Sequence, residues 1–238
     1  MENIEAAYSS KKYQIYLSEF VYGGIDGSIT TFAVVAGGVG ANLDTSIILI
    51  MGFANLLADG LSMSIGAYLS GKSEKDNFKK HKAREHWEVE HLPELERDEI
   101  REIYKEKGFT GELLEQVVQV ICSDEDVWVD TMMKEELEMI DNSKSPIDIG
   151  LVTFLSFISL GIIPLSIYVI DIFIEISFNK MVFASILTLM AFLLIGFLRG
   201  VANHKNKLLS MLETASMGAI AAVVAFYVGD FIEKLIVS

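Results

Sequence analysis

Long apolar runs along this chain are interrupted by one strongly charged stretch. Apolar residues dominate residues 15–71 and 147–238, whereas residues 72–146 hold 21 of the 33 acidic and 12 of the 19 basic residues. A helix that crosses a bilayer needs about 20 mostly apolar residues. The pattern therefore predicts two membrane-embedded blocks, separated by a segment that is too charged to cross a bilayer.

Five segments have the length of a membrane span. They cover approximately residues 20–40, 45–69, 149–170, 181–198 and 212–231. Within the charged stretch, Pro93, Gly108 and Pro146 separate segments whose apolar residues recur at helical spacing, which predicts a small bundle and not a disordered linker. We therefore expect an all-α integral membrane protein with five transmembrane helices and a helical module between the second and third.

Lysine and arginine in the short loops predict the orientation. The loop after the fourth span carries Arg199, Lys205 and Lys207, whereas the first hairpin, residues 38–44, has no basic residue. This places the N-terminus and residues 72–146 in the cytoplasm and the C-terminus on the opposite side.

The regions predicted from this pattern are residues 1–71, 72–146 and 147–238. The first comprises a surface helix and spans one and two, the second is the acidic module, and the third comprises spans three to five. Residues 3–18 have helical apolar spacing beside basic residues, which is typical of a helix lying on a membrane surface; a frayed terminus is the alternative. Because no signal or targeting segment is evident, we expect a multi-pass protein of a prokaryotic plasma membrane rather than of a vacuolar membrane.

Charge and cysteine content narrow the function. The net charge of −14 argues against nucleic acid as a partner, because binding phosphates requires basic surface. Cys122 is the only cysteine, so an intrachain disulfide and a cysteine-rich zinc site are both excluded.

Ionisable residues inside a membrane are costly, so each is a functional candidate. Asp26 lies between glycines in the first span. The alternative is a helix-packing motif made by Gly23 and Gly27, with the aspartate bonded across the interface.

The second span carries a polar stripe. Asn55, Asp59 and Met63 are four residues apart and so share one helix face. An amide, a carboxylate and a thioether together suggest a path for a cation. A lone methionine would more often be core packing.

The charged module contains paired glutamates. Three residues apart on a helix places both carboxylates of a pair on one face, and two pairs joined by a bend can converge on a cation. The candidate metal ligands are Glu85, Glu88, Glu96, Glu99, Met132, Met133 and Glu136. The alternative is a solvated helix face with ordinary surface charges.

These residues together resemble the vacuolar iron transporter family. The resemblance rests on residues 24–27 (GIDG), on residues 58–69 (ADGLSMSIGAYL), and on the two E-x-x-E pairs followed by Met-Met-x-x-Glu. It implies a homodimeric exporter that moves ferrous iron out of the cytosol in exchange for protons, along a path at the dimer interface. It also implies that Asp26 and Met63 line this path and that the module residues named above bind metal.

One position departs from the family pattern. The family commonly has a glutamate where this chain has Asn55, and an amide cannot titrate. Our hypothesis is that Asp59, one turn closer to Met63, takes over the task of the missing carboxylate.

Two other functions remain open at this stage. A membrane-tethered ferroxidase would use Glu-x-x-His motifs, of which only Glu88-x-x-His91 is present among the paired glutamates. An iron-storage or iron-sensing protein would use its spans only as an anchor. We expect no tightly bound cofactor; the transported ion is Fe²⁺, with Mn²⁺, Co²⁺ and Zn²⁺ as alternatives of overlapping ligand preference.

Overall fold

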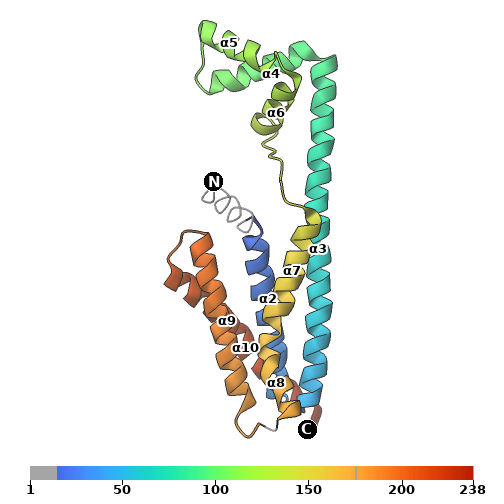
Figure 1. Ribbon diagram of the computed structural model, residues 1–238, viewed down its shortest axis with the longest axis vertical. Helices are drawn as coiled ribbons and strands as arrows, with labels where there is room; N and C mark the ends of the chain where they lie inside the picture. The colour runs from blue at the N-terminus through green and yellow to red at the C-terminus, as the bar shows by residue number, and fades with distance from the viewer. Residues whose placement is uncertain (1–14, 175, 238) are drawn as a thin grey trace, which may run out of the picture. The chain divides into compact units, whose positions relative to one another are not determined.

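The computed structural model describes residues 15–174 and 176–237, and in these ranges every regular element is an α-helix (Figure 1). Most of the predicted surface helix at residues 3–18 lies outside the described residues. The helices are α2 (Leu17–Gly40), α3 (Thr45–His91), α4 (Pro93–Glu106), α5 (Gly111–Ile121), α6 (Glu125–Glu135), α7 (Pro146–Gly161), α8 (Ile163–Phe173), α9 (Lys180–Ala202) and α10 (Lys207–Val237).

The chain divides into two compact units. The first, called the membrane unit below, comprises the chain up to Leu69 and from Lys144 onward. The second, called the module, comprises Ser70–Ser143. Helix α3 contributes residues to both units because it continues from Thr45 to His91.

Among the described residues, four helices are long and apolar enough to cross a membrane: α2, α3, α9 and α10. Helices α7 and α8 form a fifth candidate if the pair counts as one span, but they are bent by 50°. The third predicted span is therefore not one straight helix. The reason is Pro164, which lies in the first turn of α8 and has no N–H to continue the hydrogen-bond ladder of α7.

Helix α2 packs very closely against its neighbours in the membrane unit. A Cβ atom built on Gly27 would lie 2.4 Å from the carbonyl oxygen of Phe157 in α7. A Cβ atom on Gly40 would lie 2.2 Å from the carbonyl oxygen of Phe226 in α10. Only glycine permits such contact with a backbone, so these positions fix α2, and with it Asp26, against α7 and α10.

The module has its own apolar core, which includes Val89, Ile100, Val118, Trp128 and Val129. Its helix boundaries follow local chemistry. Pro93 occupies the first turn of α4, where a missing N–H costs nothing. Asp124 caps α6 by accepting a hydrogen bond from the Val127 N–H at 3.1 Å. Helix α6 ends at Glu135, and the chain turns at Glu138, which has a positive φ of 52°.

Candidate metal sites

Three helices of the module supply the predicted glutamates. Glu85 and Glu88 lie in the last turns of α3, and Glu96 and Glu99 lie in the first turns of α4. Since Leu92 is the only residue between α3 and α4, the second pair follows the first directly around the bend. Glu136 directly follows the last residue of α6.

The module brings these carboxylates into one cluster, called the glutamate cluster below. Glu85 interacts electrostatically with Glu136, Glu88 and Glu99. Glu96 interacts with Glu99, Glu85, Glu88 and Glu136. Like charges gathered from three helices are unfavourable unless a cation or protons neutralise them. The glutamates therefore do not behave as an ordinary solvated helix face.

Burial adds to the cost of ionising these glutamates. Glu85 and Glu96 are each only 3% exposed, although both are ionisable. Burial, reinforced by the neighbouring glutamates, raises the pKa of Glu85 to about 7 and that of Glu96 to about 7. The same two causes raise the pKa of Glu99 and Glu136 above the usual range for glutamate. Glu85 and Glu96 therefore take up and release protons close to neutral pH.

The cluster is not already arranged as a coordination sphere. In the described part of the chain, no three His, Cys, Asp or Glu side chains are placed to hold one metal ion. One oxygen, Oε2 of Glu96, is buried without a hydrogen-bond partner. A buried carboxylate oxygen without a partner is costly, and a bound cation would satisfy it. The residue types fit a divalent metal, and their role as its ligands stays a prediction.

Met132 and Met133 lie in the apolar core of the module, with 0% and 2% of their surface exposed. Adjacent residues on a helix point about 100° apart. Their burial satisfies a packing role, and their role as metal ligands stays a prediction.

Arg84 belongs to the cluster, although the sequence reasoning did not select it. Its guanidinium lies 2.9 Å from the Glu88 carboxylate, and its charge opposes part of the rise that burial and the neighbouring glutamates cause in the pKa of Glu85 and Glu136. The i, i+4 spacing of Arg84 and Glu88 was the available signal. Its positive charge offsets part of the repulsion in the metal-free cluster.

The single Glu-x-x-His motif is not assembled as a ligand pair. Glu88 pairs with Arg84, whereas His91 stacks on Trp87 with ring centroids 4.6 Å apart. The Nδ1 atom of His91 also lies 2.8 Å from the Trp87 carbonyl oxygen. This arrangement removes the sequence feature that favoured a ferroxidase.

In the membrane unit, Asp26 of α2 and Asp59 of α3 lie close enough for their charges to interact. Both side chains are partly buried. Among the described residues, nothing donates a hydrogen bond to the Asp26 carboxylate; only its backbone carbonyl accepts one, from Thr30. Gly23 and Gly27 pack on α7 while Asp26 interacts with α3, so the packing and functional interpretations of this segment describe different faces of α2.

The remaining path candidates lie on α3 with Asp59. The Nδ2 atom of Asn55 is buried and has no hydrogen-bond partner among the described residues. Met63 is partly buried and packs against the apolar core of the membrane unit. Among the described residues, no hydrogen bond or ion pair joins Asn55 or Met63 to Asp26, so their roles in a path stay predictions.

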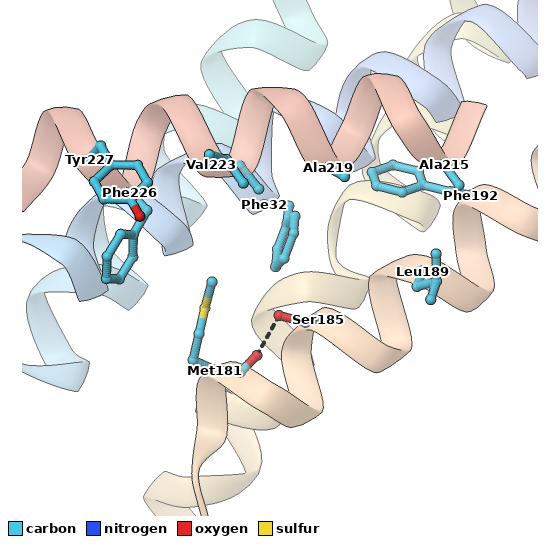
Figure 2. Close-up of a pocket in the computed structure, with 11 residues that line it drawn as sticks. Phe32, Met181, Ser185, Leu189, Phe192, Ala215, Ala219, Val223, Phe226 and Tyr227 are labelled. Carbon is cyan, nitrogen blue, oxygen red and sulfur yellow. Dashed lines mark hydrogen bonds between the residues drawn. The ribbon is translucent and has the colours of Figure 1, made fainter. Parts of the chain in front are cut away.

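The membrane unit also contains an apolar groove of about 420 Å³ between α9 and α10. Figure 2 shows α9 and α10 close together near Phe192 and Ala215 and farther apart toward Met181 and Tyr227. None of its lining residues is charged, and Ser185 donates its hydroxyl to the Met181 carbonyl at 2.7 Å. The groove contains none of the predicted path residues and is not a cation site.

Comparison with known proteins identifies a family that this chain matches. Residues 17–230 match the model of the VIT family. This range includes both the spans and the module, so the match is not confined to a single motif.

Curated relatives are similar over most of the chain. A vacuolar iron transporter of Toxoplasma gondii is 37% identical over 93% of this chain and 76% of the relative. A vacuolar iron transporter of Centaurea cyanus is 35% identical over 87% of this chain and 84% of the relative. Vacuolar iron transporter 1 of Tulipa gesneriana is 30% identical over 98% and 95%. These relatives are named transporters and not enzymes, and on this evidence the chain belongs to the VIT family of vacuolar iron transporters.

Proposed function

We propose that this protein moves a divalent metal, Fe²⁺ first, out of the cytosol in exchange for protons. The observation that carries the proposal is the pair formed by Asp26 and Asp59 on two candidate membrane spans. The names of the relatives support iron as the cargo.

The exchange of metal for protons follows from the energetics of the Asp26–Asp59 pair. Two neighbouring carboxylates in an apolar span are costly when both are ionised and unpaired. A proton or a divalent cation can neutralise them, and a metal binds only to deprotonated ligands. Metal entering the pair therefore displaces protons, and protons arriving from the far side release the metal. In this scheme Asp59 supplies the carboxylate that Asn55 cannot.

The glutamate cluster captures the ion before it reaches the membrane path. Its carboxylates, together with Met132 and Met133, form the proposed ligand set. Oxygen ligands with a soft thioether suit Fe²⁺, and Mn²⁺, Co²⁺ and Zn²⁺ remain alternative cargoes. A bound metal relieves the electrostatic repulsion among the buried glutamates. This relief contributes to the free energy of metal binding.

A second copy of the chain completes the proposed path. Asn55, Asp59 and Met63 remain partly exposed on α3, where contact with lipid would be costly for a carboxylate. Beside them runs a row of exposed small residues that permits close helix approach: Ala54, Ala58, Ser62 and Gly66. A homodimer that pairs these faces would shield the polar stripe.

The proposed topology has five spans, with the bent α7–α8 pair counted as one, and places the module in the cytoplasm. The relatives are named vacuolar, which favours a vacuolar membrane and gives no support to the prokaryotic plasma membrane expected from the sequence.

The test is metal uptake into proteoliposomes that hold the full chain. Fe²⁺, Mn²⁺ and Zn²⁺ are compared with and without an acidic interior, for wild type and for Asp26→Ala. Asp44→Asn, in the exposed turn before α3, is the control for loss of a carboxylate outside the spans. We expect Fe²⁺ uptake that rises with the pH gradient and disappears in Asp26→Ala. Absence of metal flux under every condition would refute the proposal.

A further inference from the structure

A cavity of about 750 Å³ lies at one end of the membrane unit, between the start of α2 and the end of α9. We call it the α2–α9 cleft. Its wall includes Leu17, Val21 and Ile25, and its rim includes Arg199, Asn203 and His204. The proposed transport path uses none of these residues.

The rim of the cleft is positively charged. Arg199, which lines the cleft, pairs with Glu213 at 2.6 Å, and Glu19, next to Ser18, pairs with Lys144 at 2.6 Å. Lys205 directly follows His204 in the chain and Lys207 is the first residue of α10; neither forms an ion pair with any residue in the described ranges. The Nζ atom of Lys207 lies 5.4 Å from the centre of the Phe197 ring. Within the described ranges, these two lysines therefore carry positive charge that no acid pairs with.

Position and lining together specify an amphipathic ligand. Both α2 and α9 are candidate spans, and the cleft lies between the start of α2 and the end of α9. The ends of a membrane span lie near the lipid headgroups. The apolar wall runs from this end along the first turns of α2, toward the hydrocarbon. A free phosphate would satisfy the rim and leave the wall exposed to water, whereas an acyl chain covers the wall.

We propose that the α2–α9 cleft binds one phospholipid with an anionic headgroup. The headgroup phosphate lies at the rim, where Arg199, Asn203 and His204 supply donors, and an acyl chain lies along Leu17, Val21 and Ile25. This site is independent of the proposed metal transport.

The α9–α10 groove of Figure 2 provides an internal contrast. Like the α2–α9 cleft, this groove is open and lies between two candidate spans, but none of its lining residues is charged. A lipid bound in this groove should be retained without preference for its headgroup. Preferential retention of anionic lipid therefore indicates binding in the α2–α9 cleft.

The test is native mass spectrometry of the full chain, released from nanodiscs that contain equal amounts of phosphatidylglycerol and phosphatidylcholine with identical acyl chains. Wild type is expected to retain phosphatidylglycerol preferentially. Lys205→Gln/Lys207→Gln should weaken this retention by roughly fivefold per lysine, and His204→Glu should weaken it further by repulsion. The control variant is Lys79→Gln/Lys80→Gln, which replaces two exposed lysines of the module. It changes the net charge by the same amount and should leave the retention of phosphatidylglycerol unchanged.

Three results would overturn the proposal. The first is equal retention of both lipids by wild type. The second is displacement of phosphatidylglycerol by millimolar inorganic phosphate, which would identify a free anion as the ligand. The third is lipid binding only after removal of residues 1–14, which would identify a segment of the chain itself as the occupant.

Discussion

The two units carry their acidic residues in opposite ways. In the module, five carboxylates from three helices crowd into one cluster, with the pKa of Glu85 and of Glu96 at about 7. In the membrane unit, Asp26 and Asp59 form a sparse pair among glycines and apolar side chains. In the proposed function, the crowded cluster gathers ions and responds to pH, whereas the sparse pair in the spans selects the ions that cross.

The largest expected effect separates these two roles. Asp26→Asn should reduce Fe²⁺ flux by at least about tenfold, to the level of protein-free liposomes, because the span loses a carboxylate that nothing else replaces. Glu85→Gln/Glu96→Gln should retain flux when Fe²⁺ is saturating and lose it when Fe²⁺ is scarce. Flux measured over a range of Fe²⁺ concentrations distinguishes them, and equal loss in both variants at saturation would remove the division of labour.

The next effect is the pH dependence of metal capture. Glu85 and Glu96, each with a pKa of about 7, are mostly ionised at pH 8 and mostly protonated at pH 6. Because metal binds the ionised form, affinity should fall by roughly tenfold or more as pH falls from 8 to 6. Titration of the full chain with Mn²⁺ measures this, since Mn²⁺ resists oxidation. The Asp26→Asn variant is the control, and it should keep the pH dependence of the module.

The same pKa shifts also make the stability of the metal-free module depend on pH. Stability changes with pH in the opposite direction to metal affinity. The folded-state pKa values lie above the ordinary value of 4.5, so folded Glu85 and Glu96 hold protons that the unfolded chain has released. Stability should therefore fall as pH rises from about 5 to 8, and Glu85→Gln should melt higher than wild type at pH 8. Both tryptophans, Trp87 and Trp128, lie in the module, so intrinsic fluorescence follows its unfolding. A lower melting temperature for Glu85→Gln at pH 8 would contradict the crowding.

Packing of α2 gives a smaller effect in the membrane unit. Gly27→Ala should destabilise by about 1–3 kcal/mol, because the new Cβ meets the Phe157 backbone, which cannot move aside. Transport should fall with it, since Asp26 shifts relative to Asp59. Gly37→Ala is the control on the same helix, where the nearest atom would be 3.4 Å away. Equal melting temperatures for the two variants in detergent would show that α2 is not held in this way.

The smallest effect tests the methionines. Met132→Leu conserves volume and should change stability by less than about 1.5 kcal/mol. Loss of the thioether should weaken Fe²⁺ binding by roughly two- to fivefold and Mn²⁺ binding less, because Mn²⁺ prefers oxygen ligands. Unchanged Fe²⁺ affinity would assign Met132 to core packing alone.

Periodicity and punctuation made much of the fold predictable from sequence. Pro93, Gly108 and Asp124 mark helix ends that depend only on local chemistry, and the structure has helices that begin or end beside each of them. The bend at Pro164 was equally local and was overlooked within a long apolar run. The Asp26–Asp59 interaction depends on how two helices meet, which spacing along one helix cannot reveal. The Arg84–Glu88 pair lies on one helix, so its i, i+4 spacing was available in the sequence. Dimerisation, orientation and the metal ligands still rest on proposal.

The most direct measurement is Fe²⁺ uptake by liposomes with an acidic interior, for wild type, Asp59→Asn and Asp44→Asn. If Asp59 supplies the carboxylate that Asn55 lacks, Asp59→Asn should lose the acceleration caused by the pH gradient, and Asp44→Asn should keep it. Uptake by Asp59→Asn with unchanged rate and unchanged pH dependence would contradict the role proposed for the intramembrane pair.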